Sequence, residues 1–317
     1  MADPVFIFGF GRSGTTWLAN IFDSSPDTRY SHEPDKLLPC PSLPAIITED
    51  DTSVHNAALE AYADKLIKTR LLPTINNKAV FPKSYRSLPA HLLRQAFFIL
   101  DNLAAKATGD RLLPSVPDFC NTASAVPVLK SVSSLGRLPA FAHALPKAKF
   151  IFIMRHPGAI NASLARGIKQ GKMAPLELCD DQLALDYTVK NNIGPNERDQ
   201  MSMLEEIAWS WATFNDFIMS RCSTMKNVYL LKYEDLCQDP VGKTQALFEF
   251  AGLPWQSQTK EYLQQSLLIE ANDHSYHDVL RNPVATMDKW HSEMDPADIK
   301  LMEDIAAESL PGKLYGF

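Results

Sequence analysis

Four short apolar runs, well separated along the chain, predict buried strands. Each is rich in β-branched, aliphatic or aromatic residues and lacks clear polar alternation, which is typical of a parallel sheet covered on both faces. A fifth segment, Thr28–His32, is more polar, and we expect it to be extended up to the stop at Pro34. The four apolar runs are Val5–Phe8, Val126–Lys130, Phe150–Met154 and Val228–Leu231.

Between these segments, apolar residues recur at the i, i+3, i+4 spacing of helices that pack one face against a core. The expected helices are Thr15–Phe22, Val54–Thr69, Pro89–Lys106, Leu135–Leu145, Pro157–Gly167 and Met203–Ile218. A strand, a glycine turn, a helix and a strand follow one another from residue 5 to residue 32, which is how a parallel α/β sheet opens. The predicted fold class is therefore α/β, with a central parallel sheet of four to five strands flanked by helices.

The length of 317 residues is compatible with a single large α/β domain, and we expect one domain over residues 1–317. Residues 34–125 are punctuated by prolines and mostly helical in pattern. We expect them to form a helical insertion that covers the carboxyl ends of the strands. Residues 241–317 are expected to form a helical C-terminal part.

Composition excludes several classes of protein. Hydrophobic residues make up 45% and charged residues 21% of the chain, close to ordinary globular usage, and the net charge of −6 argues against a general nucleic-acid binder. The five cysteines show no C-x-x-C spacing and the histidines no tight ligand spacing, so we expect neither a disulfide framework nor a metal site. No apolar run is long enough to span a bilayer, and no signal peptide is evident at the start.

The turn after the first strand has the chemistry of a phosphate-binding loop. Gly9 to Thr16 fits the P-loop pattern G-x-x-x-x-G-K-[ST], except that Thr15 stands where the lysine belongs. Glycines let backbone N–H groups converge and the following helix adds its positive end, so a phosphate can still be held. The missing lysine is the one that reaches the β- and γ-phosphates of a triphosphate, and the nearby cation is Arg12. The loop thus indicates a P-loop-NTPase-like fold without triphosphate chemistry.

Three signatures resemble those of sulfotransferases that use 3′-phosphoadenosine 5′-phosphosulfate (PAPS). Arg155, at the end of a strand, and Ser163 are similar to the 3′-phosphate site of that family, and Tyr233–Leu236 with Asp239-Pro240 is similar to its third signature. The resemblance implies PAPS as co-substrate, adenosine 3′,5′-bisphosphate as product, and no metal. The segment that resembles the 5′-phosphosulfate loop consists of Arg12, Ser13, Gly14, Thr15, Thr16 and Trp17.

The residues themselves agree with the second of these sites. Arg155 leaves a buried strand at its carboxyl end, where ligands bind in open α/β sheets, and Ser163 follows about two helical turns later on the same side. An arginine and a hydroxyl there suit a second phosphate, one nucleoside away from the first. The structural alternative is that Arg155 caps a helix or forms a salt bridge.

The general base is expected to be a carboxylate. Animal cytosolic sulfotransferases carry Lys-Thr-His after the third strand, but this chain has Lys130-Ser131-Val132, and valine cannot accept a proton. It is more similar to carbohydrate, bacterial and tyrosyl-protein types, in which a glutamate at the end of the second strand is the base, and Glu33 matches that place. His32 is the competitor, and strand alternation predicts that the two side chains point to opposite faces. Arg12 would favour the charged form of Glu33, whereas burial would oppose it.

Two further cations are candidates. Lys130 is expected to stabilise charge on the leaving phosphate beside Arg12, unless it is merely a solvated lysine at a strand end. Arg281, with Thr286 and Lys289, falls where the family has a C-terminal loop that closes over the nucleotide, although this segment departs from the cytosolic pattern.

The resemblance implies transfer of a sulfuryl group to a hydroxyl or amine of a small-molecule, glycan or lipid acceptor. Two alternatives stay open, a P-loop-type nucleotide kinase and a protein that binds adenosine bisphosphate without catalysis. No nucleic-acid partner is expected, and a homodimer is compatible with the sequence. The sequon Asn161-Ala-Ser163 would place a glycan on the expected phosphate helix, which favours a cytoplasmic location.

Overall fold

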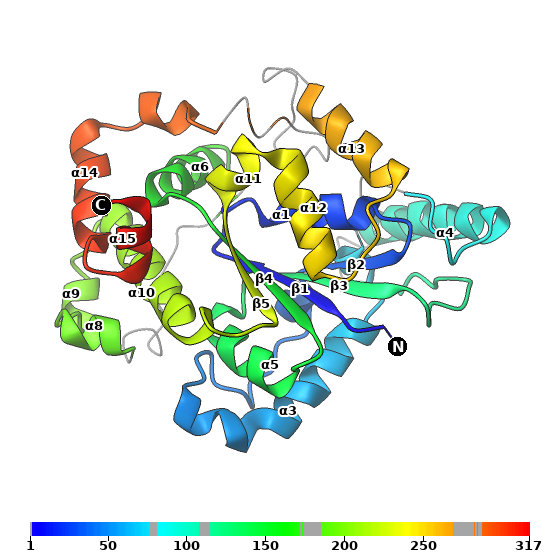
Figure 1. The fold of residues 1–317 in the computed structure, drawn as a ribbon, viewed down its shortest axis with the longest axis horizontal. Coiled ribbons are helices and arrows are strands. Elements are labelled where there is room, and N and C mark those ends of the chain that lie inside the picture. Colours follow the sequence, from blue (N-terminus) through cyan, green and yellow to red (C-terminus); the bar gives the residue numbers. More distant parts are fainter. Residues whose placement is uncertain are drawn as a thin grey trace.

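The computed structural model describes residues 2–75, 81–107, 115–171, 173, 185–268, 282, 284 and 287–317. Five parallel strands form one sheet in the order β2-β3-β1-β4-β5 (Figure 1). Every strand expected from the sequence is present, which confirms the α/β class with a central parallel sheet. The strands are β1 (Val5–Gly9), β2 (Thr28–His32), β3 (Val126–Ser131), β4 (Lys149–Met154) and β5 (Val228–Lys232).

Helices flank the sheet and supply the connections between the strands. In the described part of the chain they are α1 (Thr15–Ser24), α2 (Pro34–Leu37), α3 (Glu49–Lys68), η1 (Leu72–Thr74), α4 (Leu88–Ala107), η2 (Leu135–Arg137), α5 (Leu138–Ala144), α6 (Pro157–Lys169), α8 (Asp186–Lys190), α9 (Pro195–Arg198), α10 (Met203–Cys222), α11 (Tyr233–Gln238), α12 (Pro240–Phe250), α13 (Ser257–Leu268), η4 (Lys289–Ser292), α14 (Pro296–Ala306) and α15 (Leu310–Tyr315). None of the helices in these ranges combines the length and the apolar character needed to cross a membrane.

The strand order reverses direction beside β1. After β1 the chain crosses to β2 at one edge, returns to β3, and then continues on the other side of β1 with β4 and β5. In open α/β sheets the crevice outside the carboxyl ends of the strands, at such a switch point, is the usual ligand site.

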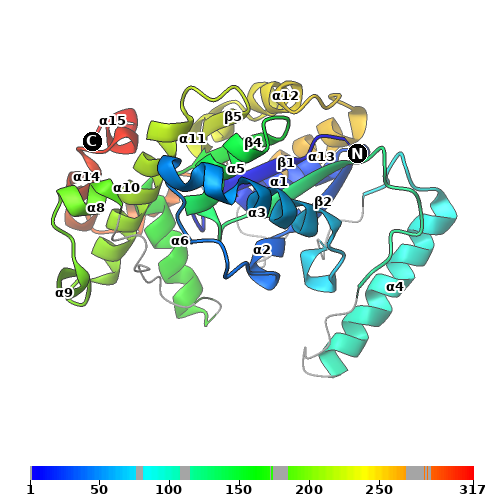
Figure 2. The ribbon, with the colours of Figure 1, turned by 90° about the horizontal axis from the view of Figure 1, so that it is seen from below.

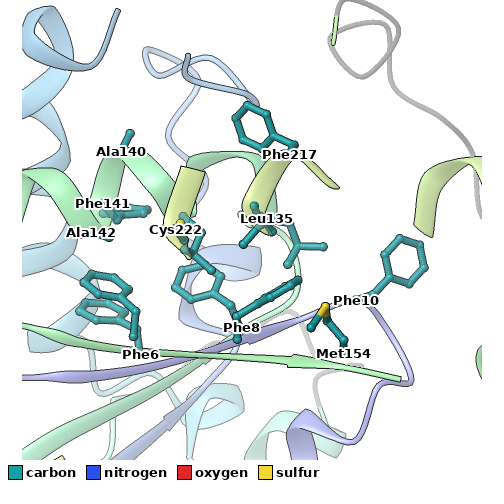
Figure 3. Close-up of a cluster of buried hydrophobic side chains, with 14 of the residues drawn as sticks. Phe6, Phe8, Phe10, Leu135, Ala140, Phe141, Ala142, Met154, Phe217 and Cys222 are labelled. Carbon is teal, nitrogen blue, oxygen red and sulfur yellow. The ribbon is translucent and has the colours of Figure 1, made fainter. Parts of the chain in front are cut away.

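Alternation along β1 divides the core into two layers. Ile7 faces a cluster with α1, α12 and α13, and Phe6 and Phe8 face the opposite layer with α5 and α10. Figure 3 shows Phe6 and Phe8 projecting from the strand toward Phe141 of α5. The rings of Phe6 and Phe150 stack with centroids 5.1 Å apart. Both faces of the sheet are therefore covered, which explains the continuous apolar runs in the sequence.

The segment between β2 and β3 contacts the sheet in more than one place. α2 lies at the carboxyl end of β3, where Asp35 accepts hydrogen bonds from Ser131 and Ser134. α3 packs on a face of the sheet against α5, where the rings of Tyr62 and Phe141 are 6.2 Å apart. α4 lies beyond the edge strand β2 and projects from the body of the molecule (Figure 2). The edge of β2 is therefore bordered by residues of this segment, which matters for the cavity described below.

Candidate functional site

Four groups with the chemistry of an anion site lie in a row across the end of the sheet that the carboxyl termini of the strands form. They follow the carboxyl ends of adjacent strands in the order β2, β3, β1 and β4. Glu33 comes after β2, Lys130 near the end of β3, the glycine-rich loop after β1, and Arg155 after β4. Lys130 is in register with Ile7 on one side and His32 on the other. The sheet thus brings together residues up to 143 positions apart in the chain.

The loop between β1 and α1 needs glycine at both ends. A Cβ on Gly9 would lie 2.7 Å from the carbonyl oxygen of Ile153. Gly14 has φ +97°, and a Cβ there would lie 2.3 Å from Cδ2 of Tyr233. Any larger residue would push the loop away from β4 or from the Tyr233 ring. Arg12 also adopts a left-handed conformation, with φ 73°.

This loop presents hydrogen-bond donors that suit a phosphate. The first turn of α1 begins at Thr15, and its backbone N–H groups have no acceptors within the helix. Among the described residues, the buried Ser13 Oγ and Trp17 Nε1 have no hydrogen-bond partner. Thr15 is itself buried, so no long cationic side chain reaches out from the lysine position of the P-loop pattern. The donor set therefore fits a single anionic group better than a Mg-triphosphate.

Arg12, Arg155 and Ser163 meet beside the loop. Arg12 Nε donates to Ser163 Oγ at 2.9 Å, and Arg155 Nη1 donates to the carbonyl oxygen of Arg12 at 3.2 Å. The Arg155 guanidinium lies 4.4 Å from the centroid of the Tyr233 ring, a cation–π contact. Within the described ranges Arg155 has no carboxylate partner, so the salt-bridge alternative has no support. The structure brings the two predicted arginines and the serine together.

The segment from Tyr233 supports these groups and was not assigned a role from the sequence. Glu234 accepts hydrogen bonds from the backbone N–H of His156 at 2.9 Å and from the hydroxyl of Tyr315 at 2.8 Å. Tyr233 packs against both Gly14 and Arg155. The residues after β5 therefore hold the loop and the start of α6 in place. In the sequence these residues were visible only as the Tyr-Glu-Asp-Leu motif at 233–236. The contacts of Tyr233 and Glu234 show what the motif does in the structure.

Glu33 and Lys130 form an ion pair at the other end of the row. Lys130 Nζ lies 2.5 Å from Glu33 Oε1, and only 4% of the lysine side chain is exposed. His32 Nε2 is 3.8 Å from the same oxygen. The prediction that His32 and Glu33 point to opposite faces was wrong, because Glu33 has already left the strand with a left-handed φ of 43°. Both candidate bases therefore lie at the same place.

Electrostatics distinguishes the two candidates. Burial raises the pKa of Glu33, but the ion pair and hydrogen bond with Lys130, together with the nearby His32 and Lys36, outweigh burial, so that pKa lies below its ordinary value. Lys130, and not Arg12 as expected, supplies the main favourable charge. Burial, together with the charge of Lys130, lowers the pKa of His32 to about 4. At neutral pH this site therefore holds a charged carboxylate beside a neutral imidazole, whose Nδ1 lies 2.8 Å from the hydroxyl of Tyr30.

A second neutral histidine lies at the start of α6. Burial and the neighbouring His291 lower the pKa of His156 to about 3. Glu303 Oε1 lies 3.5 Å from its Nε2, but that carboxylate is partly exposed and burial outweighs it. His156 Nδ1 accepts from the N–H of Gly158 at 3.1 Å and so caps the helix.

The free energy of unfolding should decrease as the pH is lowered through the mildly acidic range. Because the folded pKa values of His32 and His156 lie below the unfolded value of 6.5, the unfolded chain binds more protons, and stability is lost as pH falls from 6.5 toward 4. His156 alone contributes up to about 1.4 kcal/mol per pH unit in that window. Thermal unfolding between pH 7.5 and 4.5 measures the effect. The His156→Asn variant keeps a capping oxygen but does not titrate, so its Tm should decline less steeply, and an unchanged slope would contradict this account.

Two expectations concern the C-terminal segment and metal binding. Arg281 and Thr286 lie outside the described residues. Lys289 Nζ is 3.7 Å from Glu293 Oε1, and the neighbouring Trp290 stacks on His156 with ring centroids 4.3 Å apart.

The described ranges contain no group of three or more His, Cys, Asp or Glu side chains that could hold a metal ion.

A family model and two curated proteins are similar in sequence to this chain. A family model described as the sulfotransferase family matches residues 4–257, which include the loop, Glu33, Lys130, Arg155 and Tyr233. The chain belongs to the sulfotransferase family. Carbohydrate sulfotransferase 1 of mouse and that of rat are each 36% identical to this sulfotransferase over 75 residues, which cover 23% of this chain and 18% of theirs. The aligned part thus spans less than a fifth of those relatives.

Solved sulfotransferase structures align with this chain over nearly its whole length. Mouse sulfotransferase SULT7A1, solved in complex with PAP, aligns with a TM-score of 0.46 at 13% identity over 98% of this chain and 87% of that one. The sulfotransferase domain from the curacin biosynthetic pathway aligns with a TM-score of 0.43 at 15% identity over 98% and 99% of the two chains. At such identities and TM-scores, nothing about the activity or the ligands of this chain follows from the likeness.

Proposed function

We propose that this sulfotransferase moves a sulfuryl group from PAPS to a hydroxyl or amine of an acceptor, with Glu33 as general base. The proposal rests on one observation above all, the Glu33–Lys130 ion pair at the same sheet edge as the phosphate loop. A base candidate, a buried cation and an anion site then follow one another along adjacent strands. This order suits an in-line transfer between an acceptor on the Glu33 side and a leaving phosphate in the loop.

The loop and its neighbours would hold the two ends of the nucleotide. The first turn of α1, the unpartnered Ser13 hydroxyl and the Trp17 indole suit the 5′-phosphate. Arg155 and Ser163 suit the 3′-phosphate, with Arg12 between the two sites. Each charge-assisted contact of this kind is worth about 1.5–3 kcal/mol. Arg12 and Lys130 are the fixed cations that would neutralise charge on the leaving oxygen, without any need for a metal.

The transfer needs one proton acceptor. PAPS supplies a sulfuryl group on a phosphate–sulfate anhydride. A bond forms between the acceptor oxygen or nitrogen and sulfur, and the bond between sulfur and the bridging oxygen breaks, which leaves adenosine 3′,5′-bisphosphate. The acceptor proton goes to the Glu33 carboxylate. Lys130 lowers the pKa of that carboxylate, and a phosphate drawing on the same ammonium would weaken the pair and make Glu33 a stronger base.

Ligand-induced stabilisation tests the donor. We expect adenosine 3′,5′-bisphosphate at 100 times its Kd to stabilise the protein by about 2.7 kcal/mol, a Tm rise of several degrees. Mg-ATP should give a much smaller rise, because Thr15 stands in the place of the P-loop lysine. Equal stabilisation by Mg-ATP would instead favour a kinase. Binding of the bisphosphate without transfer of radiolabelled sulfate from PAPS to any hydroxyl or amine in a broad screen would favour a non-catalytic role.

A further inference from the structure

A cavity of about 400 Å³ lies between the edge strand β2 and α4, apart from the phosphate loop. β2 contributes Arg29 and Tyr30, the segment before α4 contributes Lys83 and Arg86, and α4 itself contributes Arg94. None of these residues entered the sequence-based prediction of the site. They are scattered over 66 positions of the chain, and only the fold brings them together.

The described lining of this cavity carries a net positive charge. Its described lining includes four cationic side chains and two carboxylates, which leaves two positive charges in excess. The cationic side chains are all at most 16% exposed. Burying like charges together is costly unless anions compensate them, so an excess of buried cations indicates a site for an anionic group. The six charged residues are Asp23, Arg29, Lys83, Arg86, Arg94 and Asp118.

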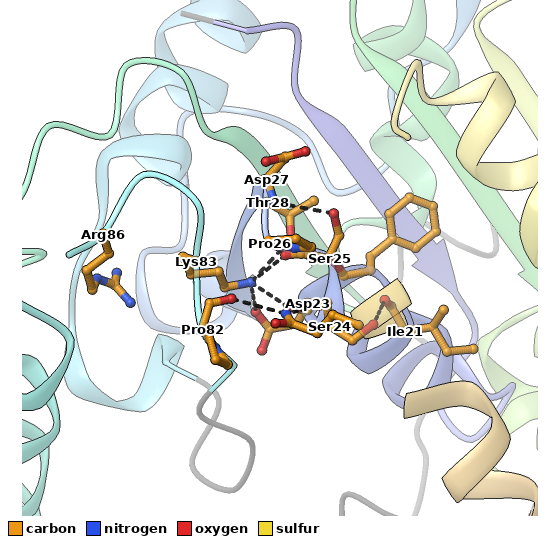
Figure 4. Close-up of polar contacts among 12 residues, drawn as sticks. Ile21, Asp23, Ser24, Ser25, Pro26, Asp27, Thr28, Pro82, Lys83 and Arg86 are labelled. Carbon is orange, nitrogen blue, oxygen red and sulfur yellow. Dashed lines mark hydrogen bonds and ion pairs between the residues drawn. The ribbon is translucent and has the colours of Figure 1, made fainter. Parts of the chain in front are cut away.

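Lys83 is already compensated within the protein. Its ammonium lies 3.0 Å from Asp23 Oδ1 and donates to the backbone oxygens of Asp23 and Ser25 (Figure 4). It thereby ties the segment before α4 to the turn between α1 and β2. The charge that lacks compensation therefore belongs to the arginines.

The carboxylate of Asp118 is the shared ionic partner of the arginines of the cavity and of the neighbouring Arg70. Asp118 accepts from Arg70 Nε at 2.6 Å and from Arg86 Nη2 at 3.2 Å. Arg94 Nε and Arg29 Nη1 lie farther from it, at 3.6 and 3.9 Å. Four guanidinium groups thus share one carboxylate. Burial and the neighbouring Arg86 lower the pKa of Arg94, which reflects this crowding of positive charge.

The arginines that line the cavity carry guanidinium N–H groups for which the described part of the chain offers no acceptor. Among the described residues, the Nε atoms of Arg29, Arg86 and Arg94 are buried without a hydrogen-bond partner. The Arg86 side chain is only 4% exposed, so water has little access to it. Buried N–H groups almost always find an acceptor. Planar N–H forks on convergent arginines match the oxygens of a carboxylate, sulfate or phosphate.

Apart from Gln95, the uncharged residues of the described lining are apolar or aromatic. Phe81, Phe98 and Ile99 border the cavity, and the Arg86 guanidinium lies 5.4 Å from the centroid of the Tyr85 ring. A small, fully hydrated ion would leave this surface uncovered. The lining therefore fits an anionic group attached to an apolar or aromatic body.

Tyr30 joins the cavity to the proposed reaction site. It lines the cavity, and its hydroxyl lies 2.8 Å from His32 Nδ1. His32 Nε2 is in turn 3.8 Å from the Glu33 carboxylate. The side chains of Tyr30 and His32 thus connect the cavity with the proposed base, Glu33.

We propose that this cavity binds the anionic end of the acceptor, a carboxylate, sulfate, sulfonate or phosphate on an apolar or aromatic body. The assignment rests on the proposed function, because it names the acceptor class of the same enzyme. Arg29, Arg86 and Arg94 hold the anion, the aromatic wall holds the body, and the hydroxyl to be modified extends past Tyr30 toward Glu33.

The first test measures binding with the phosphate loop already filled. The full-length protein is saturated with adenosine 3′,5′-bisphosphate, so that a second anion cannot enter the loop, and is titrated with naphthalene-2-sulfonate or neutral 2-naphthol. The sulfonate should bind at least about tenfold more tightly, and Arg94→Gln should remove most of that difference. Equal affinity for the two probes, or an Arg94→Gln variant with undiminished sulfonate binding, would overturn the anion site. A failure of the bisphosphate itself to bind would count against the proposed function instead.

Arg70→Gln is the matched control. Arg70 contacts Asp118 but does not line the cavity, so its loss should weaken sulfonate binding far less than the loss of Arg94. An equal loss would mean that the probe senses only the general charge around Asp118. Arg94→Lys keeps the charge without the planar fork and should retain part of the affinity, which keeps the test decisive if Arg94→Gln unfolds.

The second test assigns the cavity to the acceptor. With PAPS as donor, 6-hydroxynaphthalene-2-sulfonate should be sulfated with a KM at least about tenfold below that of 2-naphthol. Naphthalene-2-sulfonate, which has no hydroxyl, should inhibit competitively against it. Binding without turnover, or inhibition that is not competitive, would show that the cavity does not belong to the acceptor.

Discussion

The Glu33→Gln variant is expected to lose kcat by about 10²- to 10⁴-fold and to bind adenosine 3′,5′-bisphosphate almost as well as the wild type. The amide preserves the size of the side chain, and its oxygen can still accept from Lys130 Nζ, 2.5 Å away in the wild type. What it cannot do is take the acceptor proton. Single-turnover sulfate transfer, with calorimetric measurement of bisphosphate binding, separates the chemical step from nucleotide affinity.

His32→Gln is the matched control for this experiment. It removes the rival base 3.8 Å from Glu33 and leaves the ion pair with Lys130 intact. We expect its kcat to stay within about tenfold of the wild type, because the Glu33 carboxylate, the proposed proton acceptor, and its ion pair with Lys130 both remain. Full activity in Glu33→Gln, with a large loss in His32→Gln, would reverse the two assignments.

The Arg155→Ala variant is expected to bind adenosine 3′,5′-bisphosphate about 10- to 150-fold more weakly, the equivalent of one charge-assisted contact of 1.5–3 kcal/mol. The affinity for adenosine 5′-phosphate, which lacks the 3′-phosphate, should change much less. This comparison is necessary because Arg155 also donates to the carbonyl oxygen of Arg12 and could act through the loop alone. An equal loss for both nucleotides would identify Arg155 as a positioning residue for the loop.

Two further variants complete the comparison. Arg166→Ala removes an arginine from the same helix, α6, whose partner is the surface residue Glu293, and should leave nucleotide affinity unchanged. Arg155→Lys keeps the charge but loses the planar group that stacks on Tyr233, and should fall between the wild type and the alanine variant. Unchanged bisphosphate affinity in Arg155→Ala would refute the 3′-phosphate anchor.

The elements of the fold were predictable because their signals are local. β1, β3, β4 and β5 follow continuous apolar runs, since strands covered on both faces need apolar residues at every position. Boundaries were less certain. α3 begins at Glu49, five residues before the expected start, because its first turn is polar and carries no apolar period.

The candidate site was predictable only in part. Arg155 and Ser163 were expected to share one site, with Arg12 at a second site one nucleoside away. The structure instead places Arg12 in direct contact with both of them. The mutual placement of His32 and Glu33 was not predictable. A left-handed residue directly after a strand breaks the alternation on which the prediction relied, and nothing in the sequence before Pro34 announces it.

By itself, the order of residues along the chain determined where the strands lie, where the glycine-rich turn follows β1, and which charged side chains stand at strand ends. These features depend on neighbours within a few positions. Only the tertiary structure decided that Lys130 pairs with Glu33, and that arginines from β2, α4 and the segment between them surround Asp118. Such contacts depend on the order of strands in the sheet and on how distant helices pack, and that packing is a property of the whole chain.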